Sequence, residues 1–310
     1  MNNEWSDRFQ RAFGSAGAAE AFQRTRAIVG PANMPATQES QLAQTALDQL
    51  SNGQQPEARA LAALELVIKM TRPSALTLKG ALNPLPPGTD QAFGGWDSFS
   101  ARVKPFLYSI GRIDLMPDQG VGTGFLVAPD LLLTNAHVLA FLSRDTNQLT
   151  KGQAVVRFVQ EYGNFDPDPP VDILQAVAFD SDQDIALLRL GPLPDPASRA
   201  PLQIRATDAN PGETVVAVGY PFNDPQRNPM FISGIFGTKF GVKRAAPGEV
   251  VTSKNTDIGH DCSTLGGNSG SPVLSINDAS LVGLHKEGVF MFRNRALKGS
   301  FVKKFVEAHA

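Results

Sequence analysis

The stretch Asp261-Cys-Ser-Thr-Leu-Gly-Gly-Asn-Ser-Gly-Ser-Pro-Val273 decides how the rest of the chain is interpreted. It places Ser269 between Gly267 and Gly270, with Pro272 closing the turn. A serine that attacks a carbonyl needs a hydroxyl held clear of the backbone and nearby N–H groups for the oxyanion it creates. Glycines let the backbone come that close. Taken alone, the stretch fits an ordinary turn as well as it fits a nucleophile.

Two earlier segments favour the nucleophile. Thr134-Asn-Ala-His137-Val follows an apolar strand, and Asp184-Ile-Ala-Leu-Leu opens another. The chain order His, Asp, Ser is one in which catalytic triads occur. In such a triad Ser269 attacks the carbonyl, His137 transfers the proton and Asp184 orients the imidazole. The backbone N–H groups of Gly267 and Ser269 are then expected to form the oxyanion hole.

Three carboxylates crowd the position of the acid: Asp180, Asp182 and Asp184. Asp184 is preferred because it directly precedes the apolar run Ile-Ala-Leu-Leu and so stands at the edge of a buried strand. The other two are predicted to be loop residues.

Composition limits the classes of protein to consider. The chain has 310 residues, enough for two domains or for one large β domain with an extension. It is 42% hydrophobic and 19% charged, and its formal net charge of −2 argues against nucleic acid as a partner. The single cysteine excludes an intramolecular disulfide. Residues 1–8 carry charges where a signal peptide is apolar, and no run of about 18 apolar residues appears. We therefore expect a cytoplasmic protein without a membrane span.

The N-terminal quarter is predicted to be helical. Within residues 1–79, residues 8–28 are rich in Ala, Phe, Gln and Arg, and Gly14 and Gly17 are expected to break or bend this helix. Apolar side chains recur at helical spacing over residues 39–50 and 61–70. Residues 80–98 are rich in Pro and Gly and are predicted to be a linker. We expect the helical region to be either a structural extension or a sensor, adaptor or oligomerisation module that binds a protein partner.

From residue 99 onward the pattern changes to short strands separated by turns. The predicted strands are 107–115, 123–128, 131–134, 154–159, 171–179, 185–190, 214–219, 230–240, 249–253, 273–275, 281–285 and 289–292. Short strands at this spacing, without alternating helices, indicate antiparallel barrels or a sandwich. Residues 299–309 are predicted to form a closing helix. The fold class is therefore mainly β.

The chain after about residue 105 resembles the bacterial trypsin-like peptidases of chymotrypsin fold, closest to the glutamyl endopeptidase branch. The resemblance rests on Gly122-Thr-Gly-Phe-Leu, Thr134-Asn-Ala-His-Val, Asp184-Ile-Ala-Leu, Gly219-Tyr-Pro, Gly266-Gly-Asn-Ser-Gly-Ser-Pro-Val and Gly283-Leu-His. It implies a peptidase domain over residues 99–310, built of two packed six-stranded antiparallel β-barrels. His137 and Asp184 would come from the first barrel and Ser269 from the second. It further implies a serine endopeptidase that cuts protein or peptide substrates through an acyl-enzyme. The resemblance extends to intracellular members whose added modules regulate or recruit them in bacterial signalling or defence.

The same resemblance implies a specificity pocket. In the glutamyl branch, a Thr five residues before the nucleophile and a His on the following strand recognise an acidic residue before the scissile bond. The matching residues are Thr264 and His285, and Gly288 follows on the same strand. A hydroxyl and an imidazole both donate to a carboxylate. Alternatively, His285 is a core histidine and Thr264 a pocket wall. Lys286-Glu287 departs from the apolar, glycine-rich run of the family, and Glu287 would repel an acidic residue or select a basic one.

Other chemistry is not expected. His137, His260, His285 and His309 show no paired ligand spacing, so we expect neither a metal nor a cofactor. Two alternatives to an active peptidase stay open: a pseudoprotease that holds a peptide in its cleft, and a peptidase kept latent by its N-terminal region. A lipase or esterase is disfavoured because the Gly-x-Ser-x-Gly elbow is absent.

Overall fold

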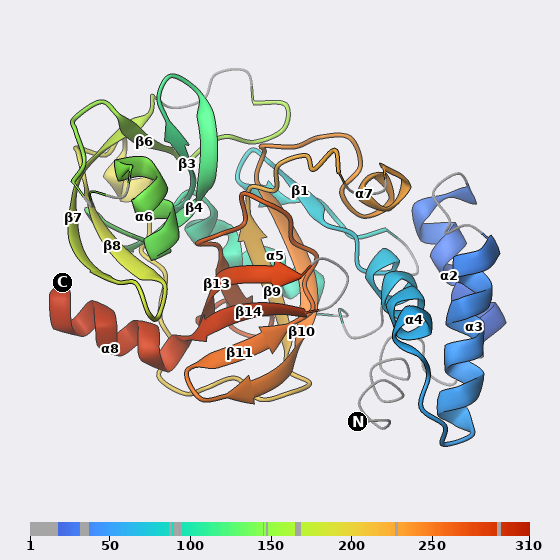
Figure 1. The fold of residues 1–310 in the computed structure, drawn as a ribbon. Coiled ribbons are helices and arrows are strands. Elements are labelled where there is room, and N and C mark those ends of the chain that lie inside the picture. The colour runs from blue at the N-terminus through green and yellow to red at the C-terminus, as the bar shows by residue number, and fades with distance from the viewer. Residues whose placement is uncertain are drawn as a thin grey trace.

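The structure is a computed structural model, and it describes residues 18–310 apart from 32–36, 87–88, 90–92, 94, 145, 147, 165–168, 227–228 and 290–292. The N-terminal helices lie beside two β-barrels, and the C-terminal helix lies on the opposite side of the molecule (Figure 1). Two parts of the predicted elements lie outside the described residues, namely the start of the helix predicted at 8–28 and the end of the last predicted strand.

The first barrel is a closed antiparallel sheet with the strand order β3-β4-β5-β8-β7-β6. Its strands are β3 (Ile110–Leu115), β4 (Gln119–Ala128), β5 (Leu131–Thr134), β6 (Ala154–Arg157), β7 (Val171–Asp180) and β8 (Ile185–Leu190). Fully buried side chains such as Ile113, Leu126 and Leu188 fill its interior. Helix α6 (Ala136–Ser143) follows β5 at once and adds Val138 and Leu139 to the same core. The barrel core therefore fixes where α6 begins.

The second barrel closes in the order β11-β14-β13-β12-β9-β10, because β10 also pairs with β11. Its strands are β9 (Thr214–Gly219), β10 (Arg244–Lys254), β11 (Asp257–His260), β12 (Pro272–Ser275), β13 (Leu281–Val289) and β14 (Arg293–Lys298). Strand β10 pairs with β9 up to Glu249 and with β11 from Val250 onward. The hairpin of β1 (Ala75–Leu78) and β2 (Ala81–Leu82) extends the sheet beyond β10. The predicted mainly β fold with two six-stranded barrels is confirmed.

Helices surround the barrels. They are α2 (Ala18–Val29), α3 (Thr37–Ser51), α4 (Ala58–Met70), α5 (Trp96–Leu107), α7 (Pro229–Phe236) and α8 (Gly299–His309). Helices α3 and α4 share a small apolar core of their own. The other face of α4 packs against α7, where Leu66 and Met70 contact Ile235 and Phe236. Helix α8 contacts strands of both barrels, β8 in the first and β13 and β14 in the second.

Buried charges also join α4 to the second barrel. Arg72, just beyond the end of α4, forms an ion pair with Asp261 and lies 3.9 Å from Glu249. Lys69 Nζ donates to Asp261 O at 3.3 Å, and the Glu249 amide donates to Asp261 Oδ1 at 2.6 Å. Each of the four residues is at most 4% exposed. Because a buried charge without a partner is costly, these contacts fix the end of α4 on the barrel. We refer to these four residues as the α4 anchor.

Some elements of the structure differ from those expected from the sequence. Residues 230–240 contain the helix α7 and not a strand, since periodicity alone does not separate a short apolar run in a strand from one in a helix. Residues 96–107 form α5 where the end of a linker and the start of the barrels were predicted; its buried residues Trp96, Phe99 and Val103 recur at helical spacing. The predicted boundary between residues 79 and 80 falls inside the hairpin β1–β2.

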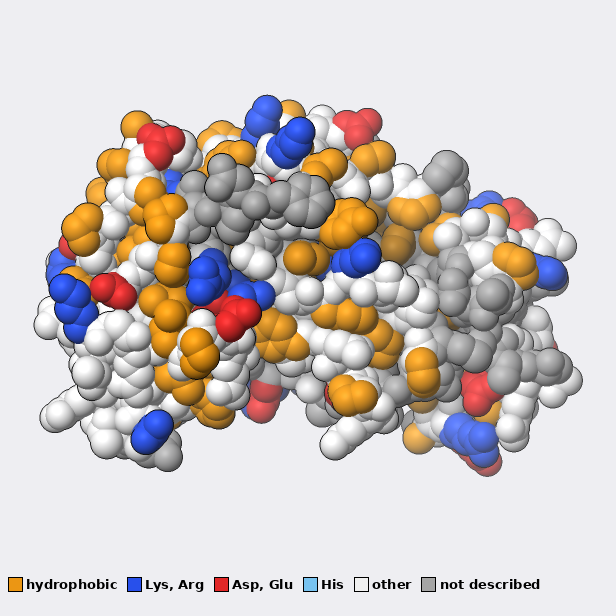
Figure 2. Space-filling view, turned by 90° about the horizontal axis from the view of Figure 1, so that it is seen from above, with side chains coloured by type: hydrophobic (Ala, Val, Ile, Leu, Met, Phe, Trp, Pro, Cys, Tyr) orange, Lys and Arg blue, Asp and Glu red, His pale blue; other side chains and the backbone are white. Residues whose placement is uncertain are grey.

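The surface carries charges of both signs. On the face seen from above, basic and acidic side chains lie in small separate groups among hydrophobic ones (Figure 2). Of the helices in the described ranges, none has the length and apolar character that crossing a bilayer requires.

Candidate active site

His137 and Asp184 meet at one end of the first barrel. Strand β5 ends at Thr134, and His137 lies in the first turn of α6. Asp184 directly precedes β8, which pairs with β5. His137 Nδ1 lies 3.0 Å from Asp184 Oδ1 and 2.9 Å from Oδ2, and the His137 backbone N–H donates to Oδ1 at 3.0 Å. One carboxylate therefore orients both the imidazole ring and the start of its helix.

Asp184 occupies an unusual backbone conformation. Its φ of 59° lies in the left-handed region, which a non-glycine residue seldom adopts. Asn135 Nδ2 donates to its carbonyl oxygen at 2.9 Å and holds it there. Burial raises the pKa of the Asp184 carboxyl, but hydrogen bonds from the His137 side chain and backbone outweigh burial and lower that pKa below its ordinary value. Asp184 is therefore ionised at neutral pH and accepts a hydrogen bond from the imidazole.

The other two acids of this segment have different surroundings. Asp180 was predicted to be a loop residue but is the last residue of β7, and its Oδ1 accepts the backbone N–H of Asp182 at 3.0 Å. The Asp182 residue is exposed. The choice of Asp184 from the sequence therefore agrees with the contact that the structure gives it to His137.

Ser269 reaches the same cleft from the second barrel. A cavity of about 600 Å³ is lined by Ala136, His137, Ala140, Ser181, Asp184, Ser269, Lys286 and Glu287. Ser269 Oγ lies 3.5 Å from Lys286 O. No hydrogen bond joins the two described side chains Ser269 and His137, and such bonds are often long before substrate binds.

The loop before the serine is held by its carbonyl oxygens. Gly266 O accepts the Phe222 amide at 2.7 Å, and Asn268 O accepts the Ser271 amide at 2.8 Å. In a trans peptide the N–H points away from the C=O. The N–H of each of these two peptides therefore points away from the amide that its own carbonyl accepts. Neither amide has an acceptor among the described residues.

These two amides belong to Gly267 and Ser269, the predicted oxyanion donors. Gly267 has a φ of +90°, and an added Cβ would lie 2.3 Å from Tyr220 O. A side chain at this position is therefore excluded both by backbone conformation and by space. The glycine seen in the sequence is required by the geometry of the loop.

Thr264 and Gly288 both lie against the side chain of Asn294. Thr264 Oγ1 donates to Asn294 Oδ1 at 2.9 Å, and Asn294 Nδ2 donates to Cys262 O at 2.6 Å. A Cβ on Gly288 would lie 2.0 Å from Asn294 Oδ1. Asn294 was not predicted from the sequence. Asn294 lies opposite Gly288 because β13 pairs with β14. The distance between the two residues along the chain does not indicate this contact.

His285 pairs with a second buried histidine. His260 Nε2 lies 3.1 Å from His285 Nδ1, and the rings meet edge to face. Burial lowers the pKa of His260 to about 3. Burial, with the neighbouring His260 and His137, lowers the pKa of His285 well below its ordinary value. Both imidazoles are therefore neutral at pH 7.

The histidine pair has a preferred tautomer. His260 Nδ1 has no hydrogen-bond partner among the described residues, and a buried lone pair without a partner is tolerated better than a buried N–H. His260 Nε2–H therefore donates to His285 Nδ1. His285 Nε2 then carries a hydrogen, and it too has no acceptor in the described part of the chain.

Lowering the pH from 7 to 5 is expected to destabilise the protein through His260. The unfolded imidazole binds a proton near pH 6.5, whereas the pKa of the folded one is about 3, so stability falls as the pH drops below 6.5. The expected loss at pH 5 is on the order of 2 kcal/mol. Urea unfolding of the His260→Gln variant should show a smaller difference between pH 7 and pH 5 than the wild type. The exposed His309→Gln should keep the wild-type difference, and equal differences in all three proteins would contradict a neutral buried His260.

The two charged residues that depart from the family pattern, Lys286 and Glu287, each pair with a charged residue of another strand. Lys286 Nζ lies 2.9 Å from Asp257 Oδ1, and Arg295 forms ion pairs with Asp257 and, at 2.6 Å, with Glu287. Two positive and two negative groups therefore balance along this edge of the cleft. Lys286 also contributes to the lowered pKa of Asp184.

Two closed antiparallel barrels, with a histidine and an aspartate from the first and a serine from the second, define the chymotrypsin-like class of fold. The family described as the trypsin-like peptidase domain matches residues 122–284, which are more than half of the chain. The chain belongs to this family.

Several curated proteins are similar to this chain. A probable serine protease of Lysobacter enzymogenes is 29% identical over 246 residues, which are 66% of this chain and 63% of that protein. Serine protease HTRA4 of Mus musculus is 28% identical, over 60% of this chain and 34% of that protein. The glutamyl endopeptidase of Staphylococcus aureus strain MW2 is 25% identical, over 62% of this chain and 54% of that protein. The chain thus spans less than two thirds of the length of these relatives.

Proposed function

We propose that this protein is a serine endopeptidase with Ser269, His137 and Asp184 as its catalytic triad. The observation that carries the proposal is the pairing of His137 with both carboxylate oxygens of Asp184, in a cleft that Ser269 also lines. Ser269 Oγ would bond to the scissile carbonyl carbon while its proton passes to His137 Nε2, and the oxyanion would accept the amides of Gly267 and Ser269. His137 would then protonate the leaving amine as the C–N bond breaks. Water would hydrolyse the remaining acyl-enzyme.

We further propose a preference for an acidic residue before the scissile bond. Two features support it: His285 Nε2–H has no acceptor among the described residues, and the hydroxyl of Thr264 is able to turn from Asn294 to a carboxylate. The charge of Glu287 is balanced by its ion pair with Arg295, so it does not repel an acidic substrate residue as an unpaired carboxylate would. One relative named above is a glutamyl endopeptidase.

For residues 1–79 we propose a regulatory or recruiting role exerted directly on the peptidase domain, residues 99–310. The α4 anchor supports this role, because it joins the helices to Asp261, three residues before Thr264. Faces of α2 and α3 that do not contact α4 would receive a protein partner. The resemblance to intracellular family members supports a bacterial, cytoplasmic signalling or defence setting.

Cleavage of a diverse peptide library tests the catalytic proposal. The purified wild type and Ser269→Ala are compared, and cut sites are identified by mass spectrometry. Cuts after Glu or Asp that vanish in Ser269→Ala are the expected result. Cuts after other residues that vanish would keep the triad and reject the acidic preference. If the wild type makes no cuts, or if Ser269→Ala makes the same ones, the proposed activity is wrong.

A further inference from the structure

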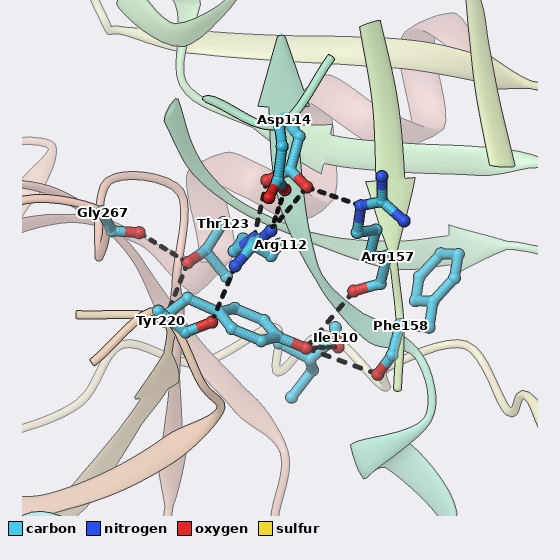
Figure 3. A network of polar contacts seen from close by, with 10 residues as sticks. Ile110, Arg112, Asp114, Thr123, Arg157, Phe158, Tyr220 and Gly267 are labelled. Atoms are coloured by element: carbon cyan, nitrogen blue, oxygen red, sulfur yellow. Dashed lines mark hydrogen bonds and ion pairs between the residues drawn. The ribbon is translucent and has the colours of Figure 1, made fainter. Parts of the chain in front are cut away.

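Thr123 stands between the two barrels at the loop that carries Ser269. It belongs to β4 of the first barrel, pairs with Arg112 of β3 and is fully buried. Figure 3 shows its hydroxyl between the carbonyl oxygen of Gly267 and the backbone of Tyr220, both from the second barrel. This side chain is therefore the point at which a strand of one barrel contacts the oxyanion loop of the other.

The hydrogen bonds of Thr123 have defined directions. The Tyr220 amide donates to Thr123 Oγ1 at 3.2 Å, which leaves the hydroxyl hydrogen for Gly267 O at 2.7 Å. The Thr123 amide donates to Ser269 O at 2.8 Å, and Thr134 Oγ1 donates to Thr123 O at 2.7 Å. Every polar group of Thr123 is thus engaged. Two of these bonds end on the residues whose amides are the proposed oxyanion donors.

The peptide between Gly267 and Asn268 is the part of the loop that the side chain of Thr123 controls. This peptide lies between the two peptides that carry the donor amides. Its carbonyl is held by Thr123 Oγ1, and its amide donates to Leu265 O at 3.1 Å. A peptide that follows a glycine turns over with little steric resistance. Turning it over would break both hydrogen bonds that hold this peptide, and the flanking Gly267 and Ser269 amides would lose that support.

We infer that Thr123 is a positioning residue for the oxyanion hole, and that its hydroxyl fixes the spacing of the two donor amides across the barrel interface. This inference rests on the proposed function. The bond from the Thr123 amide to Ser269 O uses the backbone and persists when the side chain changes. The contribution of the hydroxyl is therefore separable from that of the strand.

The test compares Thr123→Val with Thr123→Ser on a peptide that the wild type cleaves and Ser269→Ala does not. Valine keeps the shape and removes the donor, whereas serine keeps the donor. Thr77→Val is the matched control, since Thr77 is also fully buried and its hydroxyl donates to a single carbonyl, Lys243 O, at 3.2 Å. Thermal midpoints of all variants are measured alongside kcat and KM.

The expected result is a fall in kcat of about 100-fold for Thr123→Val with KM changed less than about threefold, as when one oxyanion donor is lost. Thr123→Ser and Thr77→Val should keep kcat within about threefold of the wild type. The inference is overturned if Thr123→Val keeps the kcat of Thr77→Val, or if Thr123→Ser loses as much activity as Thr123→Val.

A crystal structure of Thr123→Val separates this inference from the proposed function. The Gly267 carbonyl should leave its position beside residue 123, whether or not the protein cleaves peptides. A carbonyl that keeps its wild-type orientation overturns the inference even if the enzyme is active. Conversely, a turned carbonyl in a protein without Ser269-dependent cleavage supports the positioning role and rejects the peptidase.

Discussion

Replacing Asp184 by asparagine is expected to lower kcat for peptide hydrolysis about 10⁴-fold and to leave KM near its wild-type value. His137 Nδ1 lies within 3.0 Å of both carboxylate oxygens of Asp184, so the hydrogen on that nitrogen is held by the acid. An amide at this position presents an NH₂ group to the ring and favours the other tautomer. His137 Nε2 would then carry a hydrogen and would not accept the proton of Ser269. Steady-state kinetics on a peptide from the library measures the effect.

Asp182→Asn is the matched control for this experiment. Asp182 lies two residues away and is exposed, and it contributes its backbone N–H to the turn at Asp180. Its kcat should stay within about threefold of the wild type. A similar fall in both variants would point to the turn as a whole. An Asp184→Asn enzyme with wild-type kcat would remove Asp184 from the triad.

Replacing Arg72 by alanine is expected to lower the free energy of unfolding by about 3–5 kcal/mol. Arg72 is 1% exposed; it pairs with Asp261 and lies near Glu249, which are also buried. Removing the guanidinium leaves buried carboxylates with less compensation for their charge, which is costly. Urea unfolding at pH 7, followed by circular dichroism, measures the change.

Arg24→Ala provides the comparison, because it removes an arginine from the same N-terminal helices at an exposed pair. Arg24 Nη2 lies 2.7 Å from Glu20 Oε1 on the surface of α2, and such pairs contribute about 0.5 kcal/mol. If Arg72→Ala loses no more stability than Arg24→Ala, the α4 anchor does not hold the helices to the barrel.

The residues of the candidate triad were found from the sequence because each lies in a short linear pattern. His137 follows directly on a buried strand, and Asp184 directly precedes another. Ser269 lies between Gly267 and Gly270, and both glycines have a positive φ that other residues seldom adopt. In each case the local chain carries both the chemistry and the reason for its placement. The repeated short apolar runs predicted antiparallel barrels or a sandwich. The two six-stranded barrels followed from the family resemblance, and strands β11 and β14 were not predicted.

Other parts of the site depend on contacts that local patterns do not contain. Thr123 lies 144 residues before Gly267, and Arg72 lies 189 residues before Asp261. Asn294 enters the predicted pocket only through the register of β14 beside β13. The segment of α7 was predicted to be a strand because its short apolar run fits either element. Its packing against α4 is a long-range contact that the local sequence does not reveal. Long-range pairing and burial decide these positions, and a single sequence records neither.

The α4 anchor also bears on the order in which this chain assembles during synthesis. Helices α3 and α4 are made before any barrel strand and bury an apolar core between themselves. Their charged partners arrive much later, because the ribosome must add 189 residues after Arg72 before Asp261 exists. Contacts at such separation form late and slowly. The helical region therefore emerges before the barrels and is among the last parts to be anchored, and until then Lys69 and Arg72 remain accessible to water.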